Sequence, residues 1–174
     1  MNEIFFRNLK KNTKDLSVLF AEDDFGFRDR VIDLLLKPLK FSCLDWAGDG
    51  LDAWFQFNRR QYHLLITDFD MPGMTGGELV HRVEEKVPGQ SVLLLTRLDG
   101  LVAVKDMYRS NANVHLVSKE NASLAMAGEN APLFWETTAR AIMFSHIKML
   151  SGLNGSMHDP KNYEKTNRRQ AIQG

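Results

Sequence analysis

The sequence of 174 residues has few of the features that would assign it to a specialised class of protein. Its one cysteine, Cys43, excludes an internal disulfide and suits a reducing compartment. Its 22 basic and 22 acidic residues cancel, so the charge balance does not indicate a binder of nucleic acid. No apolar run is long enough to span a bilayer, and the acidic Glu3 before a very short apolar patch is unlike a signal peptide. These absences predict a cytoplasmic protein.

The rest of the composition is that of an ordinary globular protein, 44% hydrophobic and 25% charged. Short apolar segments alternate with segments of helical periodicity. The predicted strands are residues 16–21, 41–47, 63–67, 91–96 and 114–118, and the predicted helices are one that Pro38 ends and residues 51–59, 75–86, 100–111 and 132–150. Because the connections are short, this alternation predicts an α/β fold with a parallel sheet covered by helices on both faces.

Both ends of the chain are predicted to lie outside this domain, which spans residues 16–150. Residues 1–15 fit either a short amphipathic helix or a weakly ordered extension, and we favour the extension. Residues 151–174 are Gly, Asn, Ser and charge with little periodicity. They predict a flexible tail, and no second folded domain fits in them.

An aspartate follows the third predicted strand. The apolar residues 64–66 lead to Asp68, and Pro72 and Gly73 then break the chain. In open parallel sheets ligands bind at the carboxyl ends of the strands, so Asp68 is a candidate metal ligand or nucleophile. The alternative is that Asp68 caps the next helix or stabilises a turn. This segment alone favours neither interpretation.

Three more acids follow the first predicted strand. Glu22, Asp23 and Asp24 repel one another unless a cation lies there, although the dipole of the following helix also favours acids. At one edge of a sheet, Glu22 and Asp23 would join Asp68. An all-oxygen set with few protein ligands suits Mg²⁺.

Two further side chains reach the same edge. Thr96 ends the fourth predicted strand and Lys119 follows the fifth. A hydroxyl and an ammonium would stabilise the negative charge of a phosphoryl group in transfer. With the acids, they predict Mg²⁺-dependent phosphoryl transfer to Asp68 as nucleophile.

Over residues 16–119 the sequence resembles the receiver domain of two-component response regulators. The resemblance implies a flavodoxin-like, doubly wound, five-stranded parallel sheet in the order 2-1-3-4-5, here with an extended last helix. The motifs that carry it are Glu22-Asp23-Asp24 with Arg28 following, Ala47-x-Asp49-Gly50-x-Asp52-Ala53, Asp68-x-x-Met71-Pro72-x-Met74-x-Gly76, and finally Thr96 and Lys119.

The resemblance also implies a metal site. Mg²⁺ would be held by Glu22, Asp23, Asp68 and the backbone carbonyl of Asp70. Asp23 is favoured over Asp24 because of its spacing to Arg28, although Asp24 could substitute.

The resemblance further implies a signalling role without enzymatic activity on other molecules. Asp68 would accept a phosphoryl group from a sensor histidine kinase or phosphotransfer protein, and Thr96 and Lys119 would contact that group. Phosphorylation would shift a two-state equilibrium that a downstream target protein detects. We expect no nucleic acid or membrane contact and leave homodimer formation open.

Some positions depart from the family pattern. Arg97 replaces the small residue usual after the threonine. It either covers the site or contacts the phosphoryl group, or it is an exposed loop arginine, which we favour. The aromatic residue expected on the fifth strand falls on Leu116 or His115, depending on a one-residue shift. Residues 120–131 are predicted to intervene as a loop before Asn130 caps the last helix. That helix has surplus apolar residues, which either contact a partner or lie under the loop or the N-terminal segment.

Two other functions compete. A pseudo-receiver would bind partners without phosphorylation, and Arg97 and the missing aromatic residue keep this alternative open. Asp68-x-Asp70 after an apolar strand also occurs in haloacid dehalogenase-like phosphatases. That family places the motif on its first strand, whereas here other acids precede it.

Overall fold

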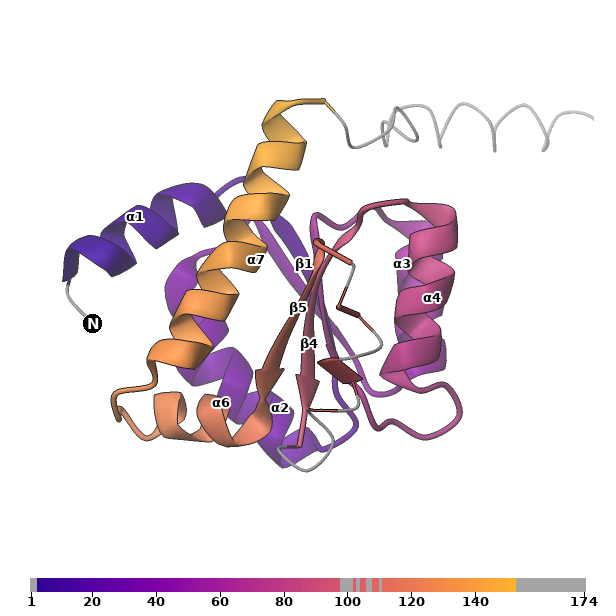
Figure 1. Cartoon of the computed structure of the whole chain (residues 1–174), viewed down its shortest axis with the longest axis horizontal. Helices are drawn as coiled ribbons and strands as arrows, with labels where there is room; N and C mark the ends of the chain where they lie inside the picture. Colours follow the sequence, from indigo (N-terminus) through magenta and orange to yellow (C-terminus); the bar gives the residue numbers. More distant parts are fainter. Residues whose placement is uncertain (1–2, 98–101, 103, 106–107, 110, 153–174) are drawn as a thin grey trace, which may run out of the picture.

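The computed structural model describes residues 3–97, 102, 104–105, 108–109 and 111–152. Its centre is one parallel sheet in the order β2-β1-β3-β4-β5 (Figure 1). The strands are β1 (Ser17–Ala21), β2 (Cys43–Ala47), β3 (Leu64–Asp68), β4 (Ser91–Thr96) and β5 (Val114–Ser118). The predicted α/β fold and its strand order are therefore confirmed.

Helices cover both faces of this sheet. They are α1 (Glu3–Thr13), α2 (Phe25–Val31), α3 (Gly50–Arg59), α4 (Gly76–Lys86), α6 (Lys119–Met126) and α7 (Pro132–Leu150). In Figure 1, α1, α2, α6 and α7 lie on one side of the sheet and α3 and α4 on the other. Half of the residues of the helix predicted over 100–111, and nearly all of the tail predicted over 151–174, lie outside the described residues.

The central strands are apolar along their whole length because both of their faces are buried. Every residue of β1, β3 and β4 is buried. Along β1, Val18 and Phe20 belong to one core cluster, and Leu19 and Ala21 belong to the other. Successive side chains of a strand point to opposite faces, so a strand covered on both sides needs apolar residues at every position.

A glycine brings the start of α4 against the end of β3. A Cβ at Gly76 would lie 1.9 Å from the carbonyl oxygen of Asp68, a distance that no side chain can occupy. Thr75 caps α4 in a capping box with Glu78. The backbone that carries Asp68 is thus packed directly against the next helix.

The prediction of a weakly ordered N-terminal extension is wrong. Glu3–Thr13 form α1, which packs beside α7 (Figure 1). Leu9 is buried, the rings of Phe6 and Trp135 meet edge to face with centroids 4.8 Å apart, and the Thr13 hydroxyl donates to the carbonyl of Leu39. The N-terminal segment therefore covers part of the surplus apolar surface of α7.

The prediction of a loop over residues 120–131 is also wrong for most of its length. Lys119–Met126 form α6, whose N-terminus is capped by the Ser118 hydroxyl accepting the N–H of Asn121. The predicted cap of the last helix differs too, since the residue before Pro132 is Ala131, which makes no side-chain cap, rather than Asn130.

Pro38 does not end the first long helical segment in the predicted way. After α2 the chain forms a π-helical stretch (Ile32–Leu36) and then a 3₁₀ turn (Lys37–Leu39) that contains the proline. The segment ends at Lys40, which takes a left-handed conformation with φ of 59°.

Candidate functional site

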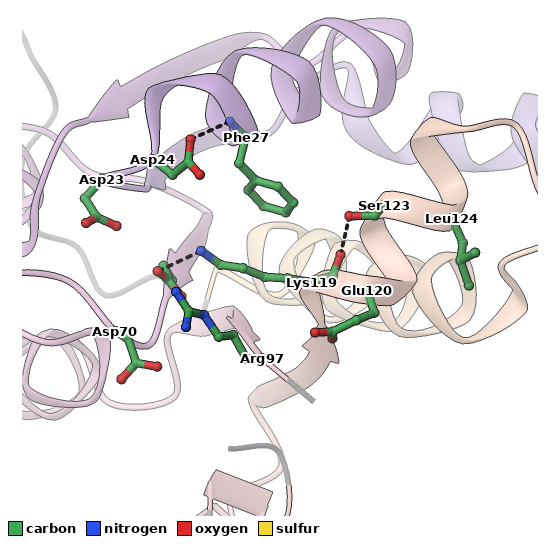
Figure 2. Close-up of a pocket in the computed structure, with 10 residues that line it drawn as sticks. Asp23, Asp24, Phe27, Asp70, Arg97, Lys119, Glu120, Ser123 and Leu124 are labelled. Atoms are coloured by element: carbon green, nitrogen blue, oxygen red, sulfur yellow. Dashed lines mark hydrogen bonds and ion pairs between the residues drawn. The ribbon is translucent and has the colours of Figure 1, made fainter. Parts of the chain in front are cut away.

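A pocket of about 760 Å³ opens where the sheet's strands end at their carboxyl edge (Figure 2). Of the predicted site residues, Asp23, Asp68, Asp70 and Lys119 line it. The full lining is Asp23, Asp24, Phe27, Asp68, Asp70, Arg97, Lys119, Glu120, Ser123 and Leu124. The structure thus brings together side chains that lie about a hundred residues apart in the chain.

Lys119 connects two of the acids. Its Nζ donates to Oε1 of Glu22 and to Oδ2 of Asp68, each at 2.8 Å. Glu22 and Asp68 are almost fully buried, with exposed fractions of 0% and 3%. Lys119 is the first residue of α6, so this cation ties α6 to the ends of β1 and β3.

Burial and this lysine determine the protonation of the acids. Burial raises the pKa of Glu22 to about 7, although the hydrogen bond from Lys119 lowers it, and the charge of Asp68 raises it further. Burial also raises the pKa of Asp68 against the opposing effect of Lys119. Burial alone would lower the pKa of Lys119, but its hydrogen bonds to Asp68 and Glu22 outweigh that effect and raise it. The site is therefore short of positive charge.

The acids are arranged as a candidate cation site. Glu22, Asp23 and Asp68 each offer a carboxylate oxygen, and these oxygens lie within 4.8 Å of one another. Oε2 of Glu22 is buried and has no hydrogen-bond partner among the described residues. Hard oxygen ligands with one left unpaired suit Mg²⁺, so the residues present fit the predicted ion.

The two remaining acids have different positions. Asp24 caps α2, where its Oδ1 accepts the N–H of Phe27 at 2.9 Å, so the helix N-terminus accounts for this member of the acidic run. This geometry favours Asp23 over Asp24 as a ligand. Asp70 lines the pocket, but its carboxylate is not one of the three clustered groups.

Thr96 lies at the end of β4 and is fully buried. Its hydroxyl has no hydrogen-bond partner among the described residues. A buried hydroxyl without a partner costs free energy, and such groups in native proteins call for an explanation. A ligand that accepts this hydrogen bond would supply one.

The structure shows where the residues that depart from the family pattern lie. Arg97 is exposed, as favoured, and it also lines the pocket. Leu116 packs with the core cluster that contains Val104, whereas His115 faces the other way, with its ring 6.1 Å from that of Phe144. The face of β5 that packs with this cluster therefore carries an aliphatic side chain at position 116.

Sequence reasoning missed one wall of the pocket. Glu120, Ser123 and Leu124 come from α6, and Phe27 faces them from α2 (Figure 2). The available signal was Ser118, a favoured helix-capping residue placed directly before Lys119.

The family of response regulator receiver domains matches residues 18–126. This chain belongs to that family. Receiver domains are signalling domains of two-component systems. The match ends at the last residue of α6, and the five-stranded sheet of the structure is the flavodoxin-like fold of the family.

Individual relatives support the assignment. Chemotaxis protein CheY-3 of Vibrio cholerae is 36% identical over 90 residues, which is 51% of this chain and 66% of that protein. Response regulator protein FleR of Pseudomonas aeruginosa is 33% identical over 101 residues, 58% of this chain and 21% of FleR. The chain matches less than two thirds of the length of either relative.

Solved structures share the fold. A response regulator receiver domain protein from Clostridium thermocellum has a TM-score of 0.59 at 16% identity, covering 77% of this chain and 96% of that one. A two-component transcriptional regulator from Clostridium phytofermentans has a TM-score of 0.61 at 23% identity, covering 75% and 95%. In the described part of this chain, no helix is long and apolar enough to cross a membrane.

Proposed function

We propose that this receiver domain accepts a phosphoryl group on Asp68 from the phosphohistidine of a histidine kinase or phosphotransfer protein. One observation carries the proposal: the ammonium of Lys119 lies 2.8 Å from the Asp68 carboxylate within a pocket that is open to a donor. The carboxylate would attack phosphorus while the phosphorus–nitrogen bond to the donor imidazole breaks. Lys119 would then pair with the phosphoryl oxygens, over which the negative charge is spread in the transition state.

The remaining predicted residues would assist this transfer. Glu22, Asp23 and Asp68, with the backbone carbonyl of Asp70, would hold Mg²⁺. When bound, the ion would offset negative charge between these carboxylates and the phosphoryl oxygens. The unpartnered hydroxyl of Thr96 would donate to a phosphoryl oxygen, which removes the cost of leaving it buried and unpaired.

The output would be a change in protein–protein contacts. It would take place in the cytoplasm and would involve no enzymatic action on the target protein. Phosphorylation would bias a two-state equilibrium by drawing Thr96 towards the phosphoryl group on Asp68, while Lys119 pairs with the same group. Leu116 stands where the family has an aromatic residue, so coupling through that position would be weaker than usual.

A pseudo-receiver that binds partners without phosphorylation is the competing function. Leu116 and Arg97 favour it, because both differ from the residues of phosphorylated family members. The pairing of Lys119 with Asp68 and the adjacent acids favours phosphorylation.

The test is covalent modification of the full chain. The protein is incubated with Mg²⁺ and acetyl phosphate and then weighed by intact mass spectrometry. We expect the mass of one phosphoryl group, absent in Asp68→Asn and retained in Asp70→Asn, because the proposed ligand atom of Asp70 is its backbone carbonyl. An unchanged mass, together with no binding of beryllofluoride, would indicate the pseudo-receiver. Steady hydrolysis of phosphate esters would indicate a phosphatase.

A further inference from the structure

The Lys119 ammonium is bounded on two sides by carboxylates and on a third by an aromatic ring. Its Nζ lies 4.9 Å from the centroid of the Phe27 ring, while the Glu22 and Asp68 oxygens lie at 2.8 Å. Phe27 is 7% exposed, and Figure 2 shows its ring and the Lys119 side chain entering the same pocket from α2 and α6. We propose that Phe27 is a positioning residue, which holds the Lys119 ammonium in place for the phosphoryl group. This inference rests on the proposed function.

The physical basis is a cation–π contact. The face of an aromatic ring carries partial negative charge and attracts an ammonium, more strongly where water is excluded. The contact differs from the two ion pairs because the ring cannot take up a proton, bind a metal ion or become phosphorylated. When Asp68 is phosphorylated and the negative charge lies on the phosphoryl group, the ring still holds the ammonium.

The ring is itself fixed independently of the lysine. Phe27 lies in the first turn of α2, where its N–H donates to the capping carboxylate of Asp24. Its side chain also belongs to the core cluster that includes Ala122 of α6. A ring held by α2 and packed against α6 gives the Lys119 ammonium a rigid boundary.

Because Phe27 also packs in the core, the test has to separate its electrostatic effect from its volume. Phenylalanine analogues with one, two or three ring fluorines keep the size of the ring nearly constant and progressively weaken the negative charge of its face. These analogues are incorporated at position 27 of the full chain. The matched control places the same analogues at Phe57, a buried aromatic residue in the other core cluster. Thermal unfolding confirms that each protein is folded.

The first measurement is the dissociation constant for beryllofluoride in the presence of Mg²⁺. We expect stepwise weaker binding along the position 27 series, reaching about threefold to twentyfold, which is the size of a partly desolvated cation–π contact. Phe27→Leu should lie at the weak end, and Phe57 analogues should leave binding unchanged.

The second measurement needs no phosphoryl chemistry. The rate at which a small acylating reagent modifies Lys119 is followed by mass spectrometry of the peptide that contains it. We expect the rate to rise with fluorination at position 27, because a lysine that the ring attracts less strongly leaves the pocket more often and meets the reagent.

The two measurements keep the hypotheses apart. If the unmodified protein fails to bind beryllofluoride, the proposed function is wrong, and the acylation rates alone decide whether Phe27 holds Lys119. If it binds, a constant affinity or a constant acylation rate across the position 27 series would overturn the role of Phe27.

Discussion

Glu22 is the acid whose protonation burial changes most clearly. Its pKa is about 7 in the folded protein against an ordinary value of 4.5. Between these pH values the folded state therefore binds more protons than the unfolded state. Without divalent cations, we expect the free energy of unfolding to fall as pH rises from about 4.5 to 7, by about 1–3 kcal/mol, and then to level off.

Urea unfolding in a chelating buffer at a series of pH values measures this slope. Glu22→Gln removes the titrating group, so its stability should vary less across the same window. Equal slopes in the two proteins would contradict the raised pKa of Glu22.

Thr96 gives a second prediction at the residue scale. Thr96→Val keeps the volume of the side chain but removes a buried hydroxyl that has no partner among the described residues. We expect it to raise the free energy of unfolding of the unmodified protein by about 1 kcal/mol, because the desolvation cost of the hydroxyl disappears. The same substitution should weaken beryllofluoride binding, since the proposed donor is lost.

Thr96→Ser is the control, because it keeps the hydroxyl and loses one methyl group. It should retain beryllofluoride binding and be less stable than the original. A valine variant that binds beryllofluoride normally would remove Thr96 from the proposed site.

At the scale of elements, the contact between β3 and α4 limits what residue 76 can be. A methyl group at Gly76 would collide with the Asp68 carbonyl, whereas one at Gly77 would meet the Phe69 ring at 3.1 Å, where a side chain can move. We expect Gly76→Ala to displace Asp68, so that the midpoint of thermal unfolding drops and acetyl phosphate adds no phosphoryl group. Gly77→Ala should be much milder, and equal losses in both variants would contradict the proposed displacement.

Elements also differ in how far the sequence predicts them. The three central strands were predictable because their continuous apolar runs, residues 18–21, 64–66 and 92–95, have few other uses in a protein with helices on both faces of a sheet. Helix α6 was not, because only Ala122 of its residues is buried and its apolar side chains show little periodicity. Helix α1 has a clear apolar face, but its order comes from contacts with Trp135 of α7, 122 or more residues away.

The faces of β5 illustrate the same limit. Side chains of a strand alternate, so a shift of one residue exchanges Leu116 and His115 between the two faces. The pairing of Leu94 with Leu116 in the sheet decides which of the two side chains lies on which face. This pairing exists only in the folded chain. By contrast, Asp68 and Lys119 could be placed at one edge from the sequence, because parallel strands all end there.

For the molecule as a whole, a bound ion should add to stability. If Mg²⁺ binds only the folded protein, a free Mg²⁺ concentration of ten times the dissociation constant raises the free energy of unfolding by about 1.4 kcal/mol. We expect a higher midpoint of thermal unfolding in Mg²⁺ than in chelator. Asp23→Asn should lose this difference, because a proposed ligand is removed.

The control is Asp33→Asn, which removes an exposed acid that pairs with Lys37. It should keep the full response to Mg²⁺. A response that survives in Asp23→Asn would place the ion elsewhere on the molecule.

The position of Lys119 as the first residue of α6 has a mechanical consequence. The cation that would detect a phosphoryl group and a helix that contacts both α2 and α7 belong to one rigid body, with no loop between them. A displacement of the ammonium can be absorbed by the methylene groups of the lysine, and beyond their reach it must turn the helix. The length of the lysine side chain would then set a threshold. A change at Asp68 that moves the ammonium less than this length leaves α6 in place, and a larger change turns it.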